Sequence, residues 1–249
     1  MRDTLNENPA YRASTEANRV MRGVLLISTF FTGLFIVGPM VLRRGRDLSL
    51  SHHGSYLLYF AALGAGFMLV EVPFIQRLTL YLGSPTYALA VVLFALLLSG
   101  GIGSLSSQQV SHGMILYRLR TVLLALLAII GLQLLLLSTI LDWTQQWPLW
   151  LRIAVAVLFI FPAGFMMGQP FPLGLRWIAA NDPAIIPWLW AINGATSVVG
   201  SAMATILALQ FGFYAVSLVG VLCYGGALGL VIWLWLGRVA GWRPLVADA

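Results

Sequence analysis

The stretch LRTVLLALLAIIGLQLLLLSTIL, residues 119–141, decides the fold class. No charged side chain lies between Arg120 and Asp142. A helix needs about 20 mostly apolar residues to cross the hydrocarbon core of a bilayer. Backbone groups in lipid must find their hydrogen bonds within the segment, which favours a helix. The stretch therefore predicts a transmembrane helix.

Similar apolar stretches recur along the chain and are separated by short polar turns. The predicted spans are Gly23–Leu42, Tyr56–Ile75, Tyr87–Ser106, Leu119–Leu141, Leu149–Gly168, Trp188–Leu209 and Tyr214–Leu236. We expect an all-α, polytopic transmembrane helix bundle of about seven helices. In domain terms, we expect a polar N-terminal tail at 1–22, a single transmembrane domain at 23–237 and a short C-terminal tail at 238–249.

Composition supports a membrane location. The 249 residues are 60% hydrophobic and only 9% charged, whereas soluble domains carry roughly 25% charged residues. All 14 basic residues are arginines, and they lie at the ends of apolar runs. That placement fits membrane-interface anchoring and argues against nucleic acid as a partner. We expect the lipid bilayer as partner and a multi-pass membrane protein.

The arginines leave the orientation open. One set of loops and the C-terminal tail hold most of them, which would place that side in the cytoplasm. The N-terminal tail carries four more on the opposite side of this arrangement. The numbers of arginines on the two sides are therefore too similar to assign the orientation in the membrane.

Two segments resemble each other at an offset of about a hundred residues. The first reads GFMLVEVPF at 66–74, and the second reads GFMMGQPFP at 164–172. Three predicted spans separate them, so the copies would have opposite orientations in the membrane. Proline-interrupted segments in inverted repeats mark midplane binding sites in transporters. We therefore consider a three-plus-three inverted repeat, with chance recurrence in apolar sequence as the alternative.

Glu71 is the most informative single residue. It lies well inside an apolar run, where a carboxylate facing lipid costs about 2.5 kcal/mol or more. It should face the bundle interior, where it could bind a cationic ligand, a proton or both. The alternative is a structural pair with Arg77, and Pro73 suggests a break in the helix nearby.

Two amide side chains could complete a site. Gln169 begins the segment QPFPLGLR, whose two prolines disfavour a regular helix; a short amphipathic helix after a helix end is the simpler interpretation. Asn193 lies early in the sixth span, ahead of a run of small residues. One interpretation is that Asn193 is a polar partner of Glu71 or Gln169. The other is that its side chain only helps neighbouring helices to pack together.

Three other sequence features lack the surroundings that a phosphate-binding loop, a metal site or a disulfide would need. The glycines of Gly100–Ser104 follow no strand, so they fit helix packing better than phosphate binding. The three histidines have no metal-ligand spacing, and Cys223 is the only cysteine. We expect no metal site, no cofactor and no catalytic residues.

Several motifs, in order, resemble the membrane region of bacterial spermidine synthase-like proteins. They are YFAALGAGFMLVEV (59–72), QR (76–77), LGSPTYA (82–88), GIGS (101–104), FPLG (171–174) and WAINGA (190–195). In that family a polyamine aminopropyltransferase-like domain is fused to hydrophobic helices. The resemblance implies that this chain lies in the bacterial inner membrane. This chain contains no such catalytic domain, so the resemblance does not imply aminopropyl transfer here, and we expect no enzyme activity.

Two functions remain. The first is a non-catalytic membrane module that binds or transports a small cation such as a polyamine, or docks a synthase-like protein partner. Its candidate ligand-binding residues are Glu71, Gln169, Asn193 and Arg77. The second is a structural subunit of a larger membrane complex, in which the chain could also form a homo-oligomer.

Overall fold

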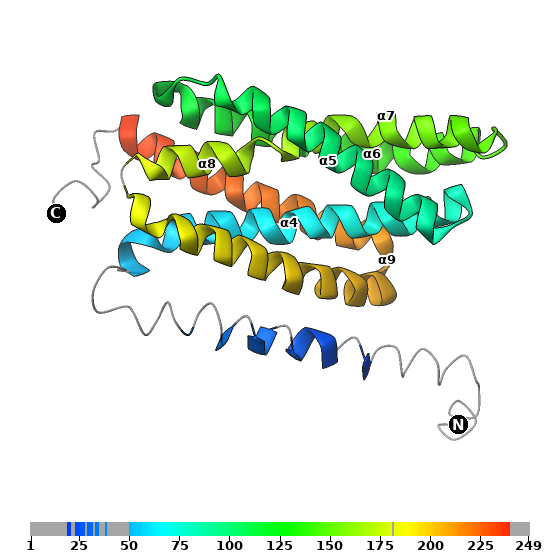
Figure 1. Cartoon of the computed structure of the whole chain (residues 1–249), viewed down its shortest axis with the longest axis horizontal. Helices are drawn as coiled ribbons and strands as arrows, with labels where there is room; N and C mark the ends of the chain where they lie inside the picture. Colours follow the sequence, from blue (N-terminus) through cyan, green and yellow to red (C-terminus); the bar gives the residue numbers. More distant parts are fainter. Residues whose placement is uncertain are drawn as a thin grey trace.

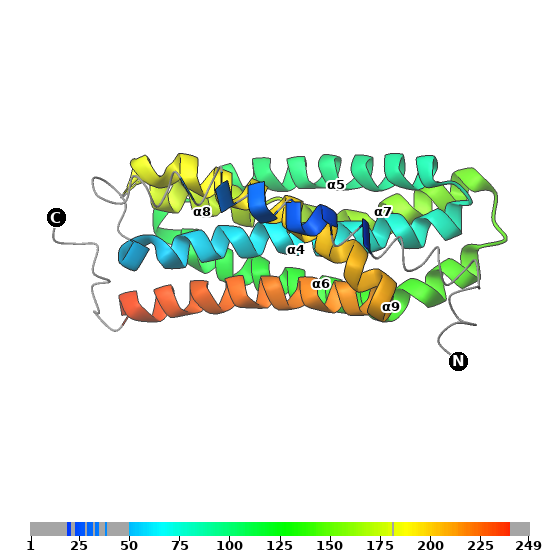
Figure 2. The same cartoon turned by 90° about the horizontal axis from the view of Figure 1, so that it is seen from below.

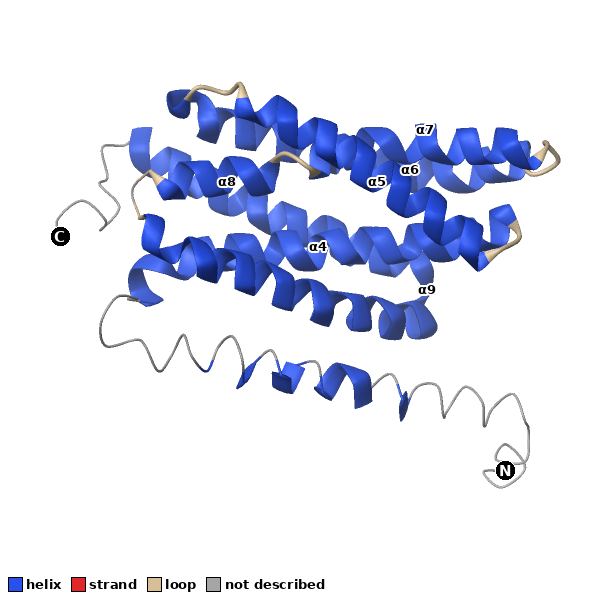
Figure 3. Cartoon of the chain, viewed as in Figure 1, coloured by secondary structure: helices blue, strands red, loops and turns tan. Residues whose placement is uncertain are grey.

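The chain was analysed as a computed structural model, which describes residues 19–20, 23–27, 29–31, 33–34, 38, 50–180 and 182–239. Every regular element from Leu50 onward is helical (Figures 1 and 3). The elements are α4 (Leu50–Leu82), α5 (Pro85–Gln108), η2 (His112–Met114), α6 (Ile115–Thr144), α7 (Leu149–Met167), α8 (Pro170–Ala179), η3 (Pro183–Ile185) and α9 (Ile186–Val239).

Five helices in the described part are long and apolar enough to cross a membrane: His53–Leu82, Pro85–Gln108, His112–Thr144, Leu149–Ala179 and Pro183–Gly237. The last of them reverses direction at Gly212, whose φ of 79° and ψ of 168° are not helical. It therefore forms two arms, 186–211 and 213–239, which lie antiparallel (Figures 1 and 2). The all-α class is confirmed.

The predicted count of seven stays a prediction. The sixth and seventh predicted spans correspond to the two arms of α9. The first, Gly23–Leu42, and both predicted tails lie largely outside the described residues.

The suggested break at Pro73 is wrong. Helix α4 continues through Pro73 to Leu82. A proline removes one backbone hydrogen bond, but its neighbours Phe74 and Leu78 are buried, and α4 is the most buried of the five candidate spans. Packing on several sides therefore holds the helix together.

The outer surface of the bundle is apolar. Exposed side chains include Leu80, Leu135, Leu158 and Leu222, each more than 70% exposed. In water, such an apolar surface would promote aggregation, whereas lipid solvates it. Together with the five long apolar helices, this surface identifies a membrane protein.

Glycines bring two pairs of helices into close contact. A Cβ at Gly103 of α5 would overlap the Phe165 carbonyl of α7, and a Cβ at Gly168 would overlap the backbone of Gly100. On the other side, a Cβ at Gly64 of α4 would overlap the backbone of α9. The packing role predicted for Gly100–Ser104 is thus confirmed.

Candidate functional site

A cleft of about 670 Å³ lies among α4, α5, α8 and both arms of α9. Its size is within the range of small-molecule sites, about 300–1,000 Å³. The wall is mostly apolar and aromatic, and it includes Phe67 and Met68 of α4, Phe171 of α8 and Trp190 of α9. We take this cleft as the candidate site.

A helix break shapes one side of the cleft. Helix α7 ends at Met167, and α8 begins at Pro170, in the first helical position, where a proline costs no hydrogen bond. Gly168, between them, lines the cleft. The predicted helix end and short helix are present, but the expectation that the two prolines exclude a regular helix is wrong. Pro170 and Pro172 lie in the first turn of α8, where a missing N–H costs no intrahelical hydrogen bond.

Of the four predicted ligand-binding residues, Asn193 is the one that lines the cleft. Its Nδ2 donates a hydrogen bond to the Phe60 carbonyl oxygen at 3.0 Å, which ties the first arm of α9 to α4. Its Oδ1 has no hydrogen-bond partner within the described residues. Asn193 is therefore both a packing residue and an available acceptor.

Tyr224 is a cleft residue that the sequence analysis missed. It is 2% exposed, lines the cleft from the second arm of α9 and packs on Gly66 of α4. Its hydroxyl makes no hydrogen bond to another described residue. A lone tyrosine within an apolar run gives no signal of its own in a single sequence.

Glu71 does not line the cleft but follows its last lining residues on α4. It is one helical turn after Phe67 and Met68, on the same face of α4. The side chain is 5% exposed, and no described residue forms a hydrogen bond or ion pair with it. The side chain is thus mostly buried, and its carboxyl has no counter-charge among the described residues.

Arg77 is not part of this arrangement. Its guanidinium lies over the ring of Phe213, 5.9 Å from the centroid. It forms no ion pair with Glu71, so the alternative of a structural Glu71–Arg77 pair has no support in the geometry.

Gln169 is fully buried next to the cleft, but its side chain is already engaged. Its Oε1 accepts hydrogen bonds from Arg118 Nε at 3.2 Å and Nη2 at 2.9 Å. Its Nε2 donates to the Phe165 carbonyl at 3.3 Å. Gln169 therefore joins α6 to the α7–α8 break rather than offering free groups to a ligand.

Polar contacts tie both ends of the bundle. At the end where α4 begins, His53 Nε2 lies 2.7 Å from Asp182 Oδ2. At the opposite end, the Tyr81 hydroxyl lies 2.6 Å from Thr144 Oγ1, and Arg152 donates to the Tyr81 carbonyl. These contacts fix the helices that surround the cleft.

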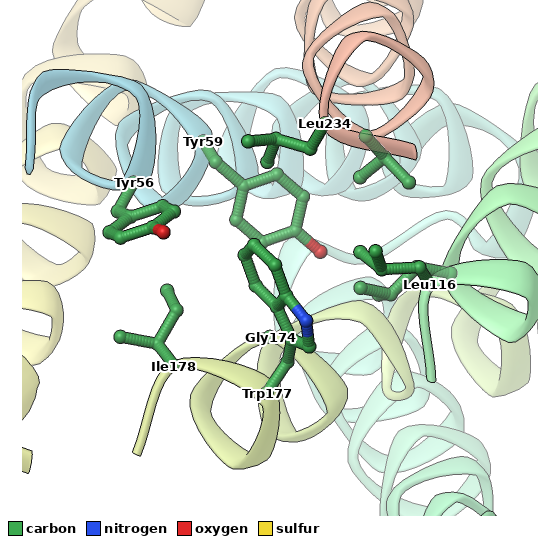
Figure 4. Close-up of a pocket in the computed structure, with 9 residues that line it drawn as sticks. Tyr56, Tyr59, Leu116, Gly174, Trp177, Ile178 and Leu234 are labelled. Atoms are coloured by element: carbon green, nitrogen blue, oxygen red, sulfur yellow. The ribbon is translucent and has the colours of Figure 1, made fainter. Parts of the chain in front are cut away.

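A second cavity lies among α4, α6, α8 and the second arm of α9 (Figure 4). Its volume is about 10 Å³, roughly the minimum for one water. The Tyr59 hydroxyl donates to the Pro170 carbonyl at 3.0 Å, and Tyr56 packs edge-on against Trp177. This cavity is a packing contact that positions α8, and it is too small for an organic ligand.

The chain was compared with known proteins. No family model, curated protein or solved structure matches it.

Proposed function

We propose that this membrane protein binds a small organic cation in the central cleft, as a first step towards moving it across the bilayer. The observation that carries the proposal is Glu71, a mostly buried acid that has no counter-charge among the described residues and lies one helical turn from the cleft. A buried charge normally has a partner. An unpaired acid at membrane depth is therefore a candidate cation or proton site.

The chemistry of the cleft supports a cation over an anion. Among the described residues, no arginine or histidine lines it. Its available polar groups are the Oδ1 of Asn193 and the hydroxyls of Tyr224 and Ser104, which can all accept hydrogen bonds from an ammonium group. Aromatic rings in the wall also favour organic cations through cation–π attraction.

A polyamine is the first ligand to test. The resemblance to the membrane region of spermidine synthase-like proteins suggests this class, and a flexible chain of methylenes and ammonium groups suits an apolar cleft with an acid at its inner end. A docked synthase-like partner would be a source of the ligand.

The helix arrangement favours a transport role through an inverted repeat. Helices α4, α5 and α6 run antiparallel to α7–α8 and the two arms of α9, respectively (Figures 1 and 2). The contact of Gly103 with Phe165 has a counterpart one repeat away, where Gly200 packs on Ala65 and Met68. The cleft lies between these halves, as the binding sites of repeat-built transporters do.

Thermal unfolding of the protein in lipid nanodiscs tests binding. We expect spermidine or putrescine to raise the melting temperature of the wild type, because saturation a hundredfold above Kd adds about 2.7 kcal/mol. The Glu71→Gln variant should lose this increase. Gln133→Leu, which changes a buried polar residue of α6 outside the cleft, should keep it.

Flux measurements then separate binding from transport. Vesicles containing the wild type should take up labelled polyamine, and vesicles containing Glu71→Gln should not. Uptake that Glu71→Gln leaves unchanged would reject transport through this site. No stabilisation by any amine would reject the binding proposal and favour a structural subunit.

A further inference from the structure

The cleft has an open side between α5 and α9. Leu97 of α5 and Trp190 of α9 both line it, yet they are 71% and 58% exposed on the outside of the bundle. Helix α5 packs on α4, α7 and α8 but has no extended contact with α9. The two residues therefore flank a lateral opening.

This opening faces the surface that lipid covers. On α5, Leu98 and Leu105 continue the exposed apolar face on which Leu97 lies, and on α9 Val198 continues the face of Trp190. A molecule that passed between Leu97 and Trp190 would come from the hydrocarbon region rather than from water.

Polarity changes from the opening to the inner end. The flanking residues are apolar or aromatic, whereas Asn193 contacts the backbone of α4 and Tyr224 is 2% exposed. Glu71 lies one helical turn after Phe67 and Met68 of the cleft wall. The wall thus offers an apolar path that ends at acceptors and an acid. That gradient suits a ligand with an apolar chain and a positively charged head group.

We infer that the ligand is a single-chain cationic amphiphile, such as a long-chain alkylamine, which enters the cleft sideways from the bilayer with its ammonium group directed towards Glu71. The inference rests on the proposed cation site for its head group. The apolar wall is the reason to infer an alkyl chain, and the lateral opening is the reason to infer entry from the bilayer.

A homologous series of alkylammonium ions, from butyl to dodecyl, tests this inference in nanodiscs by the rise in melting temperature. Each added methylene should lower the half-saturating free aqueous concentration about fourfold, because transfer of a methylene out of water is worth about 0.8 kcal/mol and the route passes through the bilayer. Spermidine provides the comparison without an apolar chain, and dodecanol the comparison without a charge.

Two substitutions of equal size test the route. Leu97→Trp should narrow the opening and weaken dodecylammonium binding at least tenfold, while binding of butylammonium changes little. Leu105→Trp provides the matched control, because Leu105 is a similarly exposed leucine of α5 that does not line the cleft. It should leave both ligands unaffected.

The outcomes separate the two proposals. Spermidine stabilisation that requires Glu71, together with no gain from chain length, would overturn the amphiphile and retain the cation site. Equal binding of dodecanol and dodecylammonium, both weakened by Leu97→Trp, would retain the lateral route and overturn the cation site. Equal effects of Leu97→Trp and Leu105→Trp would overturn the lateral route.

Discussion

Arg118 of α6 holds Gln169, the residue at the α7–α8 break, by two hydrogen bonds to the same oxygen, from Nε at 3.2 Å and from Nη2 at 2.9 Å. Gln169 is fully buried, and no acidic residue in the described part pairs with Arg118. The neutral amide is thus the side-chain partner of a partly buried cation. The cleft wall at Gly168 depends on this contact for its position.

Gln169→Leu should therefore destabilise the protein. The substitution keeps the approximate volume but leaves the guanidinium without its acceptor, at a cost of about 1–3 kcal/mol, the range for an unsatisfied buried group. The free energy of unfolding in mixed detergent micelles measures the effect.

Gln133→Leu is the control for this prediction. Gln133 is also a buried glutamine, but it lies within α6, its Oε1 has no partner among the described residues, and its Nε2 donates only to the Phe159 carbonyl. Its replacement should change stability by less than about 1 kcal/mol, because an unsatisfied atom is removed together with one hydrogen bond. Equal losses in both variants would contradict a special role for the Arg118–Gln169 contact.

The sequence predicted the helices well and the site only in part. Apolar length locates spans because the bilayer imposes it, and the reversal at Gly212 falls in the gap between the predicted spans Trp188–Leu209 and Tyr214–Leu236. The effect of Pro73 was misjudged, because neighbouring helices, which local sequence does not reveal, decide whether a proline interrupts a buried helix.

For the candidate site, too, the sequence revealed some residues and not others. Asn193 and Glu71 stood out because polar groups are rare in apolar runs, and the structure places both at or beside the cleft. Arg118 and Tyr224 were missed because their roles depend on residues more than 50 positions away. The partners of Gln169 and the position of Arg77 over Phe213 likewise come from tertiary packing alone.

Gly103→Ala should destabilise the crossing of α5 and α7. The new methyl group would overlap the Phe165 carbonyl, which belongs to helix backbone and cannot move aside. Overpacking of this kind costs about 1–3 kcal/mol. Thermal unfolding in nanodiscs measures the loss.

Gly101→Ala is the matched control, because a Cβ at Gly101 meets no atom within 4 Å. Alanine also has the higher helix propensity, by about 1 kcal/mol, so this variant should be as stable as the wild type or more so. A loss at position 101 as large as that at 103 would show that the glycines serve something other than close packing.

Gly212→Ala should strain the reversal between the arms of α9. Gly212 has a φ of 79° and a ψ of 168°, a backbone region that is essentially restricted to glycine and costs other residues about 1–3 kcal/mol. Gly225→Ala in the second arm is the control, since it has open space around it. If both variants unfold at the same temperature as the wild type, the reversal is not fixed by the conformation of Gly212.

Glu71→Gln should not destabilise the protein in the absence of ligand. In a structural ion pair, removal of one charge exposes the other and costs about 3–5 kcal/mol. Glu71 has no such partner among the described residues, so the neutral amide should match or exceed the stability of the wild type. Unfolding of both proteins in amine-free nanodiscs measures the difference. A loss of several kcal/mol would mean that the carboxylate is held by a structural cation, and the acid would then be unavailable to a ligand.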